Sequence, residues 1–284
     1  MTNSAKHFPV LLTEVLAYAQ IKEGAAVLDA TLGLGGHARE FLQQIGTSGS
    51  LIACEADASN LRIAQKNLAQ FPNKDLKHAN FRDLLPKIPA QSLDLVFFDL
   101  GVASSQLDVP ERGFSFRLTG PLDLRFDQRQ ILTAAGFLNG ATEFEIARVL
   151  REFGEIGIAR KIARNIINFR KKQKLKTTFD LAHLVQPKSL RAQVFQALRI
   201  FLNAELESLT LALPAALKAL RQGGRLGIIS FHSLEDRLVK NFLRQQPALK
   251  ILTKKPIQPS KIEVQSNPRA RSARLRFAEK SELV

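Results

Sequence analysis

Short apolar runs that end in a carboxylate recur along the first hundred residues. The runs 25–28, 51–54 and 93–98 are followed by Asp29, Glu55 and Asp99. Nearly continuous apolar runs of this length are typical of strands in a parallel sheet that is buried on both faces. Because parallel strands end at the same edge of a sheet, the three acids are expected to lie along one edge.

Helical patterns alternate with these strands. Residues 10–19, 38–45 and 58–70 each place apolar side chains on one side, and a weaker strand is expected at 76–79. Repeated strand–helix units predict an α/β fold with a doubly wound, Rossmann-like sheet.

The pattern changes after Gly101. Residues 108–127 read as a long loop, and residues 131–200 as helices without strands, one of which opens with a Thr142–Glu145 capping box. The strand pattern returns at 225–229 and again at 273–278. In between, Asn203 is expected to cap a helix that ends at Gly223 and Gly224. The organisation expected is a core in two parts, 1–108 and 203–284, with an inserted helical domain at 109–202.

A glycine-rich turn follows the first strand. Gly33, Gly35 and Gly36 allow the backbone to turn tightly and to approach a ligand closely. Asp29 stands before the turn, where it suits the ammonium of S-adenosylmethionine, and Glu55 ends the next strand, where it suits a ribose diol. A nicotinamide dinucleotide would use the second acid equally well, and a purely structural turn is the third reading.

Positive charge is in excess. Lys and Arg number 41 against 26 Asp and Glu, a formal net charge of +15, which favours a polyanionic partner such as nucleic acid. No acid occurs among residues 157–179, where a solvated helix face is the alternative to phosphate binding. The residues expected to contact RNA are Arg160, Lys161, Arg164, Lys171 and Lys172 in that stretch, and Arg269 and Arg271 in the tail. The same expectation of phosphate binding extends to Arg170 and to the tail cations as far as Arg276.

Cysteine content and hydropathy narrow the class further. The single cysteine, Cys54, excludes an internal disulfide and lies in an expected buried strand, so we interpret it as a core residue. Zinc-type cysteine pairs are absent from the sequence, and no metal site is expected. No stretch reads as a membrane span, so a soluble cytoplasmic protein is expected.

Eight motifs, taken together, resemble the bacterial 16S ribosomal RNA methyltransferase H family, the N4-cytosine methyltransferases also called MraW. The resemblance runs from His7 to Lys280. The motifs are Gly33-x-Gly35-Gly36-His37, Asp99-Leu-Gly-Val-x-Ser-Ser-Gln106-Leu-Asp108, Glu111-Arg-Gly-Phe-Ser-Phe116, Gly120-Pro-Leu-Asp123, Phe195-Gln-Ala-Leu-Arg199-Ile, Asn203-x-Glu205-Leu, Ser230-Phe-His-Ser-Leu-Glu-Asp-Arg237 and Asn267-Pro-Arg-Ala-Arg-Ser272.

The resemblance implies an S-adenosylmethionine-dependent enzyme that methylates the N4 of a decoding-centre cytidine in 16S ribosomal RNA of the small subunit. It also implies a Rossmann-like core with a helical insertion. The cofactor contacts that it carries over are Gly35, Gly36, His37, the acid at position 55, Phe81, Asp99 and Gln106. The chain departs from the family pattern at Glu55, where relatives carry Asp.

Two residues are candidates for catalysis. Asp99 ends a strand where a carboxylate can accept hydrogen bonds from the cytosine amine, and His232 could relay a proton. For the second cluster the alternative is structural, with Ser233 capping the next helix and Asp236 completing a capping box. Two other classes stay open, a nicotinamide-dependent oxidoreductase and a non-catalytic RNA-binding protein, and a homodimer is one of the oligomeric states left open.

Overall fold

The computed structural model describes residues 9–281, so His7, where the resemblance begins, lies outside the described part. The chain divides into two units. The first comprises residues 1–101 and 208–284, and the second comprises residues 102–207. The expected insertion, 109–202, lies within the second unit, which extends beyond it at both ends.

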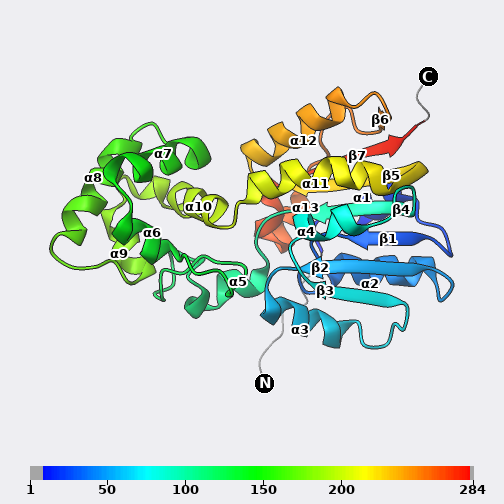
Figure 1. The fold of residues 1–284 in the computed structure, drawn as a ribbon, viewed down its shortest axis with the longest axis horizontal. Helices are drawn as coiled ribbons and strands as arrows, with labels where there is room; N and C mark the ends of the chain where they lie inside the picture. The colour runs from blue at the N-terminus through cyan, green and yellow to red at the C-terminus, as the bar shows by residue number, and fades with distance from the viewer. Residues whose placement is uncertain (1–8, 282–284) are drawn as a thin grey trace. The chain divides into compact units, whose positions relative to one another are not determined.

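One sheet forms the centre of the first unit (Figure 1). Within residues 9–281 it has seven strands in the order β3-β2-β1-β4-β5-β7-β6. The five neighbouring strands β3, β2, β1, β4 and β5 are parallel to one another, whereas β7 runs antiparallel to both β5 and β6. Their bounds are β1 Ala26–Asp29, β2 Ser50–Glu55, β3 Lys74–His78, β4 Leu93–Asp99, β5 Leu220–Ser230, β6 Leu249–Ile251 and β7 Arg274–Lys280. The expected α/β class with a doubly wound sheet is confirmed.

Alternation along β4 separates two apolar cores. Leu95 and Phe97 pack with α1, α2 and α3 on one face, and Val96 and Phe98 pack with α11 and α12 on the other. Burial on both faces explains why these strands read as apolar runs rather than as alternating patterns. The helices of this unit are α1 Leu12–Ala19, α2 Gly36–Ile45, α3 Ala58–Asn67, α4 Phe81–Leu84, α11 Glu205–Ala219, α12 Ser233–Gln245 and α13 Lys261–Ser266, with 3-10 turns η1 Leu85–Lys87 and η4 Pro268–Ser272; α11 begins in the second unit.

The expected end of the helix before β5 was wrong. Helix α11 ends at Ala219, and Gly223 and Gly224 lie inside β5. In the pairing with β4, the register jumps from Leu220 to Arg225, while β4 advances by only two residues. The two glycines therefore occupy an irregularity in the strand, a place where residues without side chains are common.

The second unit is helical. Its helices are α5 Ser104–Asp108, α6 Ala134–Gly140, α7 Glu143–Gly154, α8 Ala159–Arg170, α9 Thr178–Leu184 and α10 Arg191–Leu202, with 3-10 turns η2 Pro110–Arg112 and η3 Lys188–Leu190. The Thr142–Glu145 capping box at the start of α7 is confirmed. Ile162 and Ile166 of α8 are fully buried in a hydrophobic core that consists of residues of the second unit.

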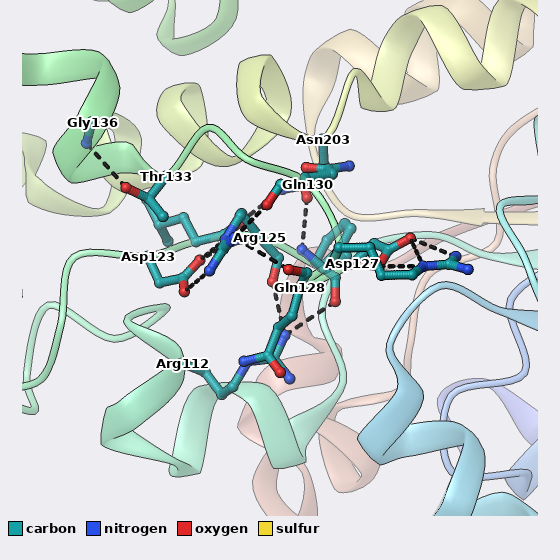
Figure 2. Close-up of polar contacts among 12 residues, drawn as sticks. Arg112, Asp123, Arg125, Asp127, Gln128, Gln130, Thr133, Gly136 and Asn203 are labelled. Atoms are coloured by element: carbon teal, nitrogen blue, oxygen red, sulfur yellow. Dashed lines mark hydrogen bonds and ion pairs between the residues drawn. The ribbon is translucent and has the colours of Figure 1, made fainter. Parts of the chain in front are cut away.

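A network of side chains holds the long loop before α6 (Figure 2). Arg125 forms a bidentate pair with Asp123 at 2.7 and 2.8 Å, and Arg112 donates to the carbonyls of Arg125 and Phe126. Asn203 accepts from the backbone N–H of Phe126 at 2.7 Å. Side chains thus satisfy backbone groups that neither a helix nor a strand satisfies here.

Asn203 therefore does not act as the expected helix N-cap. It stands at the C-terminal end of α10, and its amide donates to the carbonyls of Leu124 and Arg199. Leu124 lies 79 residues away from Asn203 in the sequence, so a local sequence pattern could not show this contact.

The structure also bears on the expected lack of membrane segments. Among the described residues, no single helix is long and apolar enough to cross a membrane. Two successive helical stretches, Lys188–Leu202 and Glu205–Ala219, meet the length and composition only when they are taken together across a break.

Candidate active site

Three acids stand at the carboxyl edge of the parallel strands. Asp29 ends β1, Glu55 ends β2 and Asp99 ends β4. Because β1 lies between β2 and β4 in the sheet, the three strand ends are neighbours, as expected. Asp29 is almost fully buried, whereas 26% of the Asp99 side chain is exposed.

The glycine turn connects β1 to α2. Gly33 and Gly35 have φ angles of 54° and 86°, in the left-handed region that favours glycine, and α2 begins at Gly36. An Asp29 carboxylate oxygen accepts from the backbone N–H of Thr31 at 3.0 Å and fixes the entry to the turn. The turn therefore brings bare backbone close to the edge where the acids lie.

Glu55 holds the glycine turn from the next strand. One carboxylate oxygen accepts from the N–H of Gly33 and the other from the N–H of Asp57, both at 2.8 Å. Each oxygen keeps a second lone pair, so these bonds leave room for an acceptor role toward a ligand. The longer Glu side chain is thus tied to the turn itself.

The two carboxylate oxygens of Asp99 have different surroundings. Its backbone N–H donates to Oγ1 of Thr31 at 2.5 Å, and its Oδ2 lies 3.6 Å from Nδ1 of His37. The other carboxylate oxygen, Oδ1, is inaccessible to solvent and has no hydrogen-bond partner among the described residues. A buried acceptor without a protein donor is a place where a water molecule or a ligand donor can bind.

Burial shapes the charge of all three acids. Removal from water raises the pKa of Asp29 to about 7 and that of Glu55 to about 7, although backbone hydrogen bonds oppose both shifts. For Asp99, burial and the charges of Asp29 and Glu235 raise the pKa to about 8. Neighbouring carboxylates resist sharing negative charge, so this edge of the sheet is suited to a cationic ligand.

The remaining residues predicted to contact the cofactor are His37 and Phe81 in the first unit and Gln106 in the second. His37 lies in α2, with Nε2 3.0 Å from the carbonyl of Val10. The ring of Phe81 packs edge-on against Phe98, with centroids 5.4 Å apart. Gln106 belongs to the second unit, where it is buried and its amide oxygen accepts from the N–H of Ala103 at 3.0 Å.

Thr31 is a site residue that the sequence reasoning missed. Its hydroxyl joins the ends of β1 and β4, because it accepts from the N–H of Asp99, which lies 68 residues away. The signal available was weak: a small hydroxyl residue two positions after Asp29, inside the turn.

The cap of α12 differs from the expected one. His232 is the N-cap, and its Nδ1 accepts from the N–H of Glu235 at 3.3 Å, while Nε2 lies 3.1 Å from a Glu235 carboxylate oxygen. Ser233 is the first helical residue, and Asp236 takes no part in the cap. An imidazole nitrogen can replace the usual capping oxygen because both offer a lone pair to an unsatisfied N–H. One nitrogen of His232 is thus committed to holding the helix start.

The cations of α8 and of the segment after it form few ion pairs with other residues of the described range 9–281. Arg160, Lys161, Lys171 and Lys172 are exposed, and Arg164 lies 3.7 Å from a carboxylate oxygen of Glu143. The expectation that the neighbouring Arg170 also faces phosphate was wrong. Arg170 donates to the carbonyls of Leu138 and Ala141 at 2.8 and 2.5 Å, where it satisfies the end of α6.

The arginines of the tail differ in their exposure and in their partners. Arg269 and Arg271 are exposed on η4. Arg274 and Arg276 instead bind Asp236, at 3.2 and 2.7 Å, so the expected phosphate-binding stretch ends earlier than position 276. Burial opposes ionisation of Asp236, but Arg276 and Arg274 outweigh it and lower its pKa.

Comparisons with known proteins find similar sequences and a similar fold. A family model described as the MraW methylase family matches residues 4–281. Two similar relatives carry the name ribosomal RNA small subunit methyltransferase H. The one from Trichormus variabilis is 46% identical, covering 96% of this chain and 92% of the relative, and the one from Halothermothrix orenii is 40% identical, covering 97% and 98%. A solved structure of a candidate rRNA methylase from Clostridium thermocellum has a TM-score of 0.50 at 14% identity, covering 96% of this chain and 99% of that chain, which shows a shared fold.

The buried acids predict a pH dependence of stability in the ligand-free protein. The pKa of Asp99 is raised on folding, so between about pH 4 and pH 8 the folded protein binds more protons than the unfolded chain. The free energy of unfolding therefore falls as the pH rises through this window. Asp99→Asn removes the ionisation and should raise the free energy of unfolding at pH 8 by about 1 kcal/mol or more, relative to its effect at pH 4.

Urea unfolding at the two pH values measures this difference. Asp83→Asn is the matched control, because it makes the same chemical change at a side chain that is 60% exposed. Parallel pH profiles for wild type and Asp99→Asn would show that Asp99 ionises as readily in the folded protein as in the unfolded chain.

Proposed function

The chain belongs to the MraW methylase family, and from this premise we propose that it transfers a methyl group from S-adenosylmethionine to the N4 amino group of a decoding-centre cytidine in the RNA of the small ribosomal subunit. The observation that carries the proposal is the buried Oδ1 of Asp99, which has no hydrogen-bond partner among the described residues. It lies at the edge of the sheet where β1 and β2 end in Asp29 and Glu55. That edge offers acceptors both to a cationic methyl donor and to an amine.

The residues present fit the cofactor. S-adenosylmethionine, when bound, supplies a methyl group activated by a positively charged sulfur. Asp29 and Glu55, whose pKa values burial raises to about 7, would ionise more readily beside the positive charges of that molecule. Glu55 would accept from the ribose hydroxyls while it holds Gly33, and the glycine turn leaves the backbone bare for a close approach.

Asp99 would act on the amine. Cytosine N4 is a poor nucleophile because its lone pair is delocalised into the ring. A hydrogen bond from the amine to Oδ1 of Asp99 would favour a tetrahedral nitrogen and hold it in line with the methyl group. Ionised Asp99 is the stronger acceptor, and a nearby cationic cofactor would lower its pKa toward that state. After transfer the carboxylate could hold the released proton, since its own pKa in the ligand-free protein is about 8.

RNA would be bound through phosphate contacts. The cations of α8 and η4 are exposed, so they can replace the counterions of an RNA backbone. The target base would have to leave its stack to reach Asp99. Neither rival class, a nicotinamide-dependent oxidoreductase or a non-catalytic RNA-binding protein, is favoured by an observation on this chain.

The decisive test is methyl transfer to defined RNA. Small subunits that lack the modification, and their free RNA, are incubated with labelled S-adenosylmethionine, and the modified base is identified by mass spectrometry. N4-methylcytidine at one decoding-centre position is expected from the wild-type protein, and none from Asp99→Ala. Label on another base or position would overturn the proposed specificity, and binding of RNA without transfer would favour the non-catalytic class.

Glu55 should contribute directly to cofactor affinity. Glu55→Ala removes the acceptor for the ribose hydroxyls and releases Gly33, so binding of S-adenosylmethionine should weaken by about 1.5–3 kcal/mol. Calorimetric titration measures the change. Asp75→Ala is the control, because Asp75 is an exposed acid on the adjacent strand β3. Unchanged affinity in Glu55→Ala would remove this residue from the cofactor site.

Asp99 should affect the chemical step more than cofactor binding. Asp99→Asn keeps the shape and one acceptor oxygen but loses the charge, so single-turnover methylation at saturating cofactor should slow by about 100-fold. Cofactor affinity, measured separately by calorimetry, should change much less. A wild-type rate in this variant would restrict Asp99 to holding the cofactor and move the search for the partner of the amine to His232.

The cations at the end of α8 should contribute to RNA affinity. Charge reversal of Lys171 and Lys172 should weaken RNA binding and flatten its salt dependence, by about 0.7 per lost contact for single-stranded RNA, while cofactor affinity stays constant. Reversal of Lys66 and Lys87, two exposed lysines of the first unit, changes the net charge equally and is the control. Equal salt slopes for the two double variants would refute the assignment.

A further inference from the structure

An exposed aromatic pair lies on α9 of the second unit. Phe179 is 61% exposed, and its ring stacks with that of His183, with centroids 6.0 Å apart and planes 29° apart. The two residues are four positions apart, so they lie on the same side of the helix. The opposite side carries Leu181 and Ala182, which are buried in the core of the unit. The rings are thus held outward by a helix that is anchored from behind.

The surroundings of this pair are cationic. Lys174 and Lys176 precede α9, Lys188 follows it, and all three are exposed. The nearest acid, Asp180, has its carboxylate occupied by the backbone N–H groups of Lys176 and Thr177 at 2.9 Å. Asp180 also interacts electrostatically with Lys176, so it offsets part of the positive charge near the start of the helix.

Helix α9 is also joined to the elements that bear the other cations. Asn165 of α8 donates to the carbonyl of Leu184 at 3.3 Å, and the carbonyl of Lys176 accepts from the N–H of Leu122 at 2.9 Å. The aromatic pair is therefore fixed within the unit that carries the α8 cations.

A second exposed phenylalanine shows what an isolated ring looks like. Phe144 is 71% exposed in the first turn of α7, between Glu143 and Glu145. Acids at a helix start are ordinary, and scattered exposed apolar residues need no explanation. Phe179 differs from Phe144 in having a stacked aromatic partner.

We propose that Phe179 and His183 form a stacking platform for an unpaired nucleobase of the RNA, with Lys174, Lys176 and Lys188 near its phosphates. Single-stranded RNA is commonly bound by aromatic faces inside a cationic surface, because every base has a flat face and every nucleotide a negative charge. The base would extend the stack that the two rings already form. This inference rests on the proposed RNA substrate and assigns the second unit a role in gripping unpaired nucleotides.

Tryptophan substitution gives a direct measurement. The chain has no tryptophan, so Phe179→Trp and Phe144→Trp each carry a single fluorophore. Single-stranded RNA of about twelve nucleotides, within the range of sites bound by such surfaces, is titrated into both variants, and an abasic ribose-phosphate strand of equal length is used in parallel. We expect saturable quenching in Phe179→Trp with RNA but not with the abasic strand, and none in Phe144→Trp.

Affinity measurements supply an independent readout. Phe179→Ala should bind the RNA about 5- to 30-fold more weakly, Phe179→Trp should bind like the wild type, and Phe144→Ala should change affinity less than twofold. RNA binding without quenching in Phe179→Trp, or equal loss in the two alanine variants, would overturn the platform and leave the proposed methyl transfer standing. Failure of the wild-type protein to bind this short RNA would also overturn the platform, whereas the proposed methyl transfer is tested separately on the small subunit and its RNA.

Discussion

The burial of carboxylates at one edge of the sheet is the constraint on which the site depends. Asp29, Glu55 and Asp99 are brought together because β1, β2 and β4 are adjacent and parallel. Burial raises the pKa values of all three acids, and neighbouring carboxylates add to the shifts of Glu55 and Asp99, so the edge holds less negative charge than its composition indicates. A cationic ligand stabilises the ionised form of these buried acids, and this interaction contributes to the free energy of ligand binding.

The same acids also build the turn that a ligand would meet. Glu55 holds Gly33, Asp29 holds Thr31, and the Thr31 hydroxyl in turn accepts from the backbone of Asp99. The site is therefore a small closed network in which each strand end positions a neighbour. Oδ1 of Asp99 is the buried acceptor that this network leaves open.

Several motif residues outside the core unit have structural roles. Arg112, Asp123 and Asn203 belong to motifs that carry the family resemblance, and all three take part in holding the loop before α6. Arg199 makes a bidentate pair with Glu205 at 2.8 and 3.0 Å. A long loop without regular structure needs such bonds, because its backbone groups would otherwise lack partners. A motif residue in this family can therefore mark the shape of the loop rather than a contact with substrate.

The sequence by itself determined the α/β class, the order of the strands from 25 to 99, the positions of the acids and the helical nature of residues 131–200. Those features follow from apolar periodicity, which is set locally by which face of an element is buried. Tertiary structure alone decided which polar groups are committed and which are open. Charge counting grouped Arg170, Arg274 and Arg276 with the cations expected to bind RNA. In the structure Arg170 donates to two backbone carbonyls, and Arg274 and Arg276 pair with Asp236. His232 took the capping role expected of Ser233, and Gly223 and Gly224 entered a strand. The physical reason is the same in each case: a hydrogen bond or an ion pair depends on a partner that folding brings near, and that partner leaves no periodic mark in the sequence.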